Sequence, residues 1–367
     1  MPGFRENVRI TASLACVAAL GVALGACDSG SSDGDGEAFA ELAQYRGEDR
    51  QEVLLDGALA EGEVVWYTTL TVNIAEALAT AFEAAYPGIT VDLFRTADRD
   101  LTQRVITEYR AGRHEADVIT PSGSGPQIRA SIGAVPWDSP AMTDYPTGDL
   151  GVDPEGREVA IAQFVRSFGY NTDRVDENQV PTQWEDLLDP RWRDRIVISN
   201  SPGLGLMMIG GLIDLLGEEQ AIQFLERFSE QNPQMAATGQ AGTVDEVVAG
   251  SADACICSVH TVNGLAAQGA PVAYSMLGDT YFVSLQTTMF PPEPQHPHAA
   301  VLFNDFLIAA DGGQQVLKDN LYTPTHPSLA EQDPAIEGRT AWVLTDERAN
   351  AGYERWDELF SRYIGAG

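Results

Sequence analysis

Apolar and polar positions along the chain alternate in a pattern that predicts strands and helices in turn. Residues 63–70 (EVVWYTTL) are rich in β-branched and aromatic side chains, as a buried strand is. Apolar side chains then recur at helical spacing over 74–86, before Pro87 and Gly88 end the helix. Strands at 89–94 and 117–120, with a helix at 100–111 between them, continue the series. Strands separated by helices form parallel sheets, so this part predicts one α/β lobe.

A second α/β series follows a longer strand-like run at 159–170 (VAIAQFVRSFGY). The pattern predicts further strands at 196–199, 254–258 and 272–275, and helices that end at Gly217, cover 219–230 and begin at Thr243. A late helix is expected at 299–309, and a last, amphipathic helix at 346–363. We therefore predict two lobes, with 49–165 plus 276–367 forming lobe 1 and 166–275 forming lobe 2.

The N-terminus has the pattern of an export signal. Arg5 and Arg9 precede a mostly apolar run at 14–24 that is too short for a permanent membrane helix. The run ends in Leu-Gly-Ala-Cys, which resembles a bacterial lipobox and predicts a signal peptide at 1–26 with Cys27 as the lipidated residue. Ordinary secretion beside an incidental cysteine is the alternative. The acidic, Gly/Ser-rich stretch that follows predicts a flexible tether over 27–48.

Charge narrows the classes of partner. The net charge is −32, and removal of 1–26 takes away two bases and one acid, which leaves −33. Nucleic-acid binding is excluded, because it depends on basic patches that neutralise phosphates. The acidity would attract cations or basic partners, or it reflects adaptation to a salty habitat.

Several segments, in order and at similar spacing, resemble one known family. They are 49–69, 81–88 (AFEAAYPG), 116–118, 169–173 (GYNTD), 184–192 (WEDLLDPRW) and 298–307 (HAAVLFNDFL). Together they resemble the bacterial extracellular solute-binding proteins of ABC importers, of the iron(III)-type group.

The resemblance implies a type II periplasmic-binding-protein-like fold, in which two lobes joined by crossing strands close on a ligand. It implies a non-enzymatic, monomeric protein without a cofactor. The lipobox-like cysteine adds the expectation that the protein is held at the outer face of the cell membrane. Such a protein captures a small anionic or metal-chelate solute and delivers it to an ABC permease and its ATPase. A ligand-sensing accessory subunit is the first alternative, and a hydrolase or transferase on the same scaffold is the second.

The candidate ligand site lies where strands end and helices begin. In open α/β sheets ligands bind beyond the carboxyl ends of strands, where helix N-termini offer N–H groups to anions. Hydroxyl groups and glycines occur in four such segments, three after predicted strands and one at the start of a predicted helix, and they could equally serve as ordinary caps and turns. These candidates are Thr68, Thr69, Ser122, Gly123, Ser124, Ser201, Gly203 and Thr243.

Two side chains near the predicted crossings complete the set. Arg166 could pair with a carboxylate or phosphonate, or could support the hinge through a salt bridge. Tyr281 could line the cleft or pack in the core.

The chain departs from the family at 257–262 (CSVHTV), where ferric members carry adjacent tyrosines. Fe³⁺ prefers anionic oxygen ligands, so direct tyrosinate–iron binding is not expected here. Relatives bind phosphonates, thiamine derivatives, polyamines or small organic anions, which leaves the ligand open.

Cysteine and histidine usage adds little chemistry. We expect Cys255 and Cys257 to be two buried thiols, because a one-residue spacing on a strand closes poorly into a disulfide. They could form a metal set with His260, but a fourth ligand is not evident. Cys257 and His260 are also the only hint of a nucleophile and base. His296 and His298 are expected in a surface loop.

Overall fold

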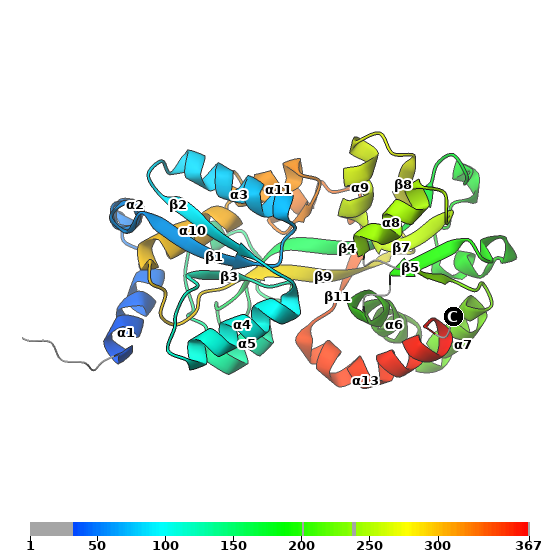
Figure 1. Ribbon diagram of the computed structural model, residues 1–367, viewed down its shortest axis with the longest axis horizontal. Helices are drawn as coiled ribbons and strands as arrows, with labels where there is room; N and C mark the ends of the chain where they lie inside the picture. Colours follow the sequence, from blue (N-terminus) through cyan, green and yellow to red (C-terminus); the bar gives the residue numbers. More distant parts are fainter. Residues whose placement is uncertain (1–31, 200–201, 237–239, 366–367) are drawn as a thin grey trace, which may run out of the picture.

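The computed structural model describes residues 32–199, 202–236 and 240–365, and it confirms the predicted two-lobed α/β fold (Figure 1). Lobe 1 contains α1 (Ser32–Ala43), α2 (Arg50–Glu61), β1 (Glu63–Thr68), α3 (Val72–Ala85), β2 (Thr90–Arg95), α4 (Asp98–Arg110), β3 (Val118–Thr120), α5 (Gly125–Ile132), α10 (Pro297–Ile308), α11 (Gly313–Asp319), β10 (Thr323–Pro324) and α12 (Pro327–Ala330). Lobe 2 contains β5 (Ile196–Ser199), α6 (Pro202–Leu216), α7 (Glu218–Ser229), β6 (Gln234–Ala236), α8 (Gln240–Val248), β7 (Ala254–Ser258), α9 (Val259–Ala267), β8 (Val272–Ser275), β11 (Thr340–Val343) and α13 (Asp346–Tyr363).

Lobe 1 is built on the parallel sheet β2-β1-β3, with helices on both faces. Alternate residues of β1 enter different cores, as the two-residue period of a strand requires. Val64 and Trp66 pack with α3 and α10, whereas Tyr67 packs with α4 and α5. The carboxyl ends of β1 and β3 point toward lobe 2 (Figure 1).

Two antiparallel strands, β4 (Val159–Asn171) and β9 (Thr280–Thr288), connect the lobes. In lobe 2, β4 continues into the larger sheet by pairing with β7 and β8, while β9 pairs with β11. A register shift between Ala160 and Ala162 bends the ribbon within lobe 1. The ribbon is the mechanical link between the lobes, and it determines which side chains face the space between them.

The C-terminal helix α13 belongs to lobe 2, which corrects the assignment of all of 276–367 to lobe 1. Trp356 is buried with the side chains of α6, α7 and β5. Gly210 of α6 permits the close approach of Trp356 to this helix, because a Cβ there would lie 2.6 Å from the ring. On α13 itself, Gly352 leaves room for the same ring, since a Cβ there would lie 2.2 Å from it. The chain therefore crosses between the lobes a third time before β11.

Part of the predicted tether at 27–48 is helical, because α1 covers Ser32–Ala43. Phe39 is buried against Phe290, with ring centroids 5.3 Å apart, and Ala43 joins the same core. The predicted signal peptide at 1–26 and Cys27 lie outside the described residues. Within the described part of the chain, no helix is long and apolar enough to cross a membrane.

Cys255 and Cys257 form a disulfide, where two separate thiols were predicted. Both residues are buried on β7 and face Gly169 of β4. A Cβ at Gly169 would lie 2.5 Å from the Cys257 sulfur and 2.9 Å from the Cys255 sulfur. The absence of a side chain at Gly169 thus provides the space that the sulfur atoms fill.

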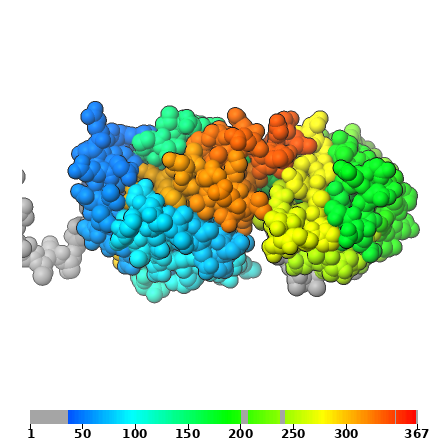
Figure 2. All heavy atoms as spheres, turned by 90° about the horizontal axis from the view of Figure 1, so that it is seen from above, coloured from blue at the N-terminus to red at the C-terminus, as the bar shows by residue number. Residues whose placement is uncertain are grey.

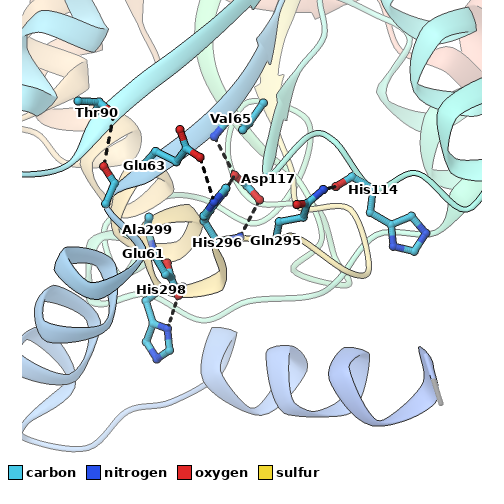
Figure 3. A network of polar contacts seen from close by, with 11 residues as sticks. Glu61, Glu63, Val65, Thr90, His114, Asp117, Gln295, His296, His298 and Ala299 are labelled. Carbon is cyan, nitrogen blue, oxygen red and sulfur yellow. Dashed lines mark hydrogen bonds and ion pairs between the residues drawn. The ribbon is translucent and has the colours of Figure 1, made fainter. Parts of the chain in front are cut away.

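A network of carboxylates and histidines holds the start of α10 in lobe 1 (Figure 3). Buried Asp117 accepts hydrogen bonds from the backbone of Val65 (2.7 Å) and His296 (2.9 Å), and its carboxylate lies 2.7 Å from His296 Nδ1. Glu61 holds His298 in a similar way, at 2.6 Å from Nδ1. Both histidines are therefore bound to carboxylates within the lobe.

This network predicts a pH dependence of stability. The hydrogen bond with Asp117, reinforced by the negative charge of Asp117, Glu63 and Glu61, raises the pKa of His296 above its ordinary value of 6.5. A raised pKa means that the stabilisation is complete below pH 6.5 and is lost as pH rises through the folded-state pKa. The native protein and the His296→Gln variant are compared by their free energies of unfolding. As pH rises through the folded-state pKa of His296, we expect the native value to fall by about 1 kcal/mol relative to that of the variant. Urea unfolding from about pH 6 to pH 9 checks this, and a constant difference would contradict it.

Candidate interlobe ligand site

One face of the crossing ribbon looks into the space between the lobes. Phe164 pairs with Ser284 and Ala162 with Gln286, and directly opposed residues of an antiparallel pair point to the same side. Phe164, Arg166 and Gln286 therefore share this face, which we call the ligand face. Figure 2 shows a notch on one side between the cyan part of lobe 1 and the yellow part of lobe 2.

Arg166 is the buried cation of the ligand face. Its Nη1 donates a hydrogen bond to Ser258 Oγ at the end of β7, and the residue is only 9% exposed. Burial lowers the pKa of Arg166 to about 9, because the charged form has lost solvation. A guanidinium with reduced solvation binds an anion more strongly than one in water does.

His260 lies in the first turn of α9, next to Arg166. Burial, followed by the positive charge of Arg166, lowers its pKa to about 3, so the imidazole is neutral at physiological pH. The ring stacks on Tyr322 of lobe 1 with centroids 4.6 Å apart, and Phe164 lies 5.3 Å away. Its Nδ1 is buried and has no hydrogen-bond partner among the described residues. The site thus combines a buried cation, an aromatic contact between the lobes and an unsatisfied ring nitrogen.

The wall from lobe 1 is formed by hydroxyl groups after β1. Thr69 Oγ1 accepts a hydrogen bond of 3.0 Å from Gln286 Nε2 of the ribbon. Thr71 Oγ1 lies 2.7 Å from the Tyr322 hydroxyl and caps no N–H of α3 through its side chain. Of the predicted pair, Thr69 reaches the ligand face, whereas Thr68 is buried beneath it and bonds to Thr120 (2.6 Å) and to the Leu70 N–H (3.1 Å).

The predicted anion-binding turn after β3 already holds an internal carboxylate. Asp98 Oδ1 accepts from the Ser122 N–H (2.9 Å) and from Ser124 Oγ (3.0 Å). Gly123, between them, has a left-handed φ of 150° that favours glycine. This turn therefore binds the first turn of α4, and its groups are not directed at an external anion.

The remaining predicted residues lie apart from this cluster or outside the description. Tyr281 is buried in the core, where its hydroxyl donates to Gln163 Oε1 (3.1 Å), and burial raises its pKa to about 12. Thr243 is buried within α8, which begins before it at Gln240. Gly203 lies in the first turn of α6, and Ser201 is outside the described residues.

Sequence reasoning missed the aromatic part of the site. Phe164 and Gln286 follow from the alternation of the ribbon once β9 is known. Tyr322 had no local signal, because it lies in a loop between α11 and β10 and reaches His260 only through the fold. His260 was considered only as a metal ligand or a catalytic base.

The structure offers no support for chemistry at this site. Cys257, proposed above as a possible nucleophile, is buried and bonded to Cys255. Within the described ranges no group of three His, Cys, Asp or Glu residues is arranged to hold a metal ion.

Comparison with known proteins identifies a family. A sequence model described as "Bacterial extracellular solute-binding protein" matches residues 136–350, which is more than half of the chain. Iron uptake protein A1 of Synechocystis sp. is 22% identical over 230 residues, covering 62% of this chain. The chain spans 54% and 62% of the lengths of the curated relatives it matches.

Solved structures share the two-lobed fold. Iron-bound HitA from Pseudomonas aeruginosa has a TM-score of 0.67 at 20% identity, covering 81% of this chain and 99% of HitA. AfuA from Actinobacillus pleuropneumoniae, with fructose-6-phosphate bound, has a TM-score of 0.64 at 21% identity, covering 84% of this chain and all of AfuA (100%). At these identities the likeness concerns the fold.

Proposed function

Because this chain belongs to the family of bacterial extracellular solute-binding proteins, we propose that it is the substrate-binding component of an ABC import system. It captures a small anionic or metal-chelate solute between its lobes and delivers it to the permease and ATPase of that system. The protein itself performs no chemistry on the solute.

The position of Arg166, a buried cation on the ribbon between the lobes, is the main support for this proposal. The residue lies on the ribbon that connects the lobes, it is buried, and it contacts Ser258 at the start of a lobe 2 helix. The N-terminus of α9 adds partial positive charge next to the guanidinium. A bound anion would therefore interact with the ribbon and lobe 2, while Thr69 and Tyr322 approach from lobe 1.

The ligand class follows from what these residues can coordinate. HitA is described as iron-bound, and AfuA as bound to fructose-6-phosphate. Here His260 stands in the segment where ferric relatives carry tyrosines, and it stacks on Tyr322. Neutral imidazole and hydroxyl groups are weak ligands for Fe³⁺, whereas Arg166 suits phosphate, phosphonate or carboxylate. An anion or an anionic chelate fits this cluster better than a bare ferric ion.

We further propose that a lipid on Cys27 anchors the monomeric protein at the outer face of the cell membrane after removal of 1–26. Helix α1 begins at Ser32, so a fully extended connection from Cys27 reaches at most about 17 Å. The end of lobe 1 that carries α1 would therefore stay close to the membrane. Globomycin treatment, which blocks removal of lipoprotein signals, should leave a larger precursor, and unchanged processing would contradict the anchor.

A thermal-shift screen tests the binding proposal. Purified protein is heated with inorganic phosphate, fructose-6-phosphate, a phosphonate, ferric citrate, a dicarboxylate, thiamine phosphate and spermidine. A ligand at one hundred times its Kd stabilises the folded state by about 2.7 kcal/mol, which raises the melting temperature by several degrees. We expect a shift with an anionic compound and none with spermidine. A shift with spermidine alone would reverse the ligand class.

A further inference from the structure

A cavity lies between the lobes, away from the residues of the proposed ligand site. It has a volume of about 690 Å³. Its lobe 1 wall comes from α5 and the segment 148–158, and its lobe 2 wall comes from the end of β11 and the first turns of α13. In Figure 1 these first turns lie below the ribbon beside α4 and α5. We call this space the back cavity.

The back cavity lies on the other face of the ribbon from Arg166. Its floor is formed by Ala160, Leu285 and Thr287. Leu285 and Thr287 alternate along β9 with Gln286, which points to the ligand face and bonds to Thr69. Ala160 pairs with Thr287 and lies on the same side as it, because the register shift between Ala160 and Ala162 changes the face. Successive side chains of a strand point to opposite faces, so the two spaces are separated by the thickness of the ribbon.

Each wall of the back cavity is braced within its own lobe. Arg129 of α5 bonds to Asp153 at 2.8 Å and to Glu158 at 3.1 Å, all in lobe 1. Arg348 of α13 donates to the Val343 carbonyl at 2.6 Å and lies 3.5 Å from Asp214, both in lobe 2. The walls therefore move with their lobes. At the floor, Thr287 Oγ1 is buried and has no hydrogen-bond partner in the described part of the chain.

We propose that the back cavity controls closure of the ligand site, by a lever action across the ribbon. When the ribbon bends toward the ligand face, the two lobes approach each other on the side of the ligand site, and the two walls of the back cavity move apart. A group that fills the back cavity then favours the closed arrangement, and a contact that draws its walls together favours the open one. The inference rests on the proposed function for its biological role, but the coupling itself requires no ligand.

Filling the cavity by mutation tests the coupling. Ala351 lines it from α13, and Ala351→Trp adds a large side chain there at a small cost in helix propensity. Small-angle X-ray scattering of the ligand-free protein should show a smaller radius of gyration than that of the native chain. Asn350→Trp is the matched control, because Asn350 is exposed on the same helix and does not line the cavity.

The outcomes are separable. A smaller radius for Ala351→Trp with no change for Asn350→Trp supports the coupling. An unchanged or larger radius for Ala351→Trp, or an equal change in both variants, overturns it. If Ala351→Trp does not fold, the smaller Ala351→Phe decides by the same criterion. If the ligand screen finds no ligand, the scattering result still stands. If scattering shows no coupling, the proposal that the protein binds a ligand still stands.

Discussion

Replacing Arg166 by alanine is expected to weaken binding of the compound identified by thermal shift by at least about 100-fold, or about 2.8 kcal/mol. The guanidinium is buried on the ligand face and bonds to Ser258, so its removal leaves an anion in a poorly solvated site without its counter-charge. Titration calorimetry of the native protein and the variant measures the change.

Two variants separate a direct contact from a general effect of charge. Arg191→Ala removes the same charge from an exposed pair with Asp189 in lobe 2, and we expect less than a twofold change in Kd. Arg166→Lys keeps the charge but loses the planar fork, and should fall between the native protein and Arg166→Ala. Equal losses for Arg191→Ala and Arg166→Ala would remove Arg166 from the site.

Replacing Trp356 by alanine is expected to destabilise lobe 2 by about 3–5 kcal/mol, because a large buried ring is lost and its cavity remains. The ring packs over Gly210 and lies 6.4 Å from the ring of Trp342. Hydrogen exchange should show faster exchange in α6, α7 and β5, with β1–β3 unchanged.

Tyr353→Ala on the same helix is the control for this effect. Tyr353 is 49% exposed, so its removal should change stability by no more than about 0.5 kcal/mol. If Trp356→Ala instead loosened lobe 1, the placement of α13 in lobe 2 would be refuted.

The amphipathic helices and buried strands could be predicted because their periodicity is local. The last helix was predicted at 346–363, as it occurs, but its lobe was not. Helix α6 is apolar on most faces, so its sequence does not indicate which helix covers it. The contact depends on glycines such as Gly210, whose role emerges only when Trp356 lies against it.

Two helices could not be predicted from the sequence because they begin with residues that are typical of turns. Helix α5 begins at Gly125 and has Pro126 in its first turn. Glycine and proline are typical of turns, so the sequence does not predict a helix here, although proline is well tolerated in the first turn. The tether was overestimated for a similar reason. Gly and Asp precede Phe39, and only the buried contact with Phe290 shows that α1 packs on the lobe.

The candidate site was only partly predictable, since sequence does not distinguish an internal partner from an external ligand. Ser122 and Ser124 have the composition of an anion-binding turn, but their anion is Asp98. Arg166 was predictable because it lies on a long strand that must cross between lobes. Tyr322 was not, because its contact with His260 joins segments far apart in the chain.

The proposed function requires that this protein binds a solute without altering it. The most direct measurement is equilibrium dialysis of the native protein against the anion that gives the largest thermal shift, followed by mass spectrometry of the recovered compound. We expect one molecule to be bound per chain and to be recovered unchanged. Conversion of the compound, or saturation at no fixed ratio, would contradict it.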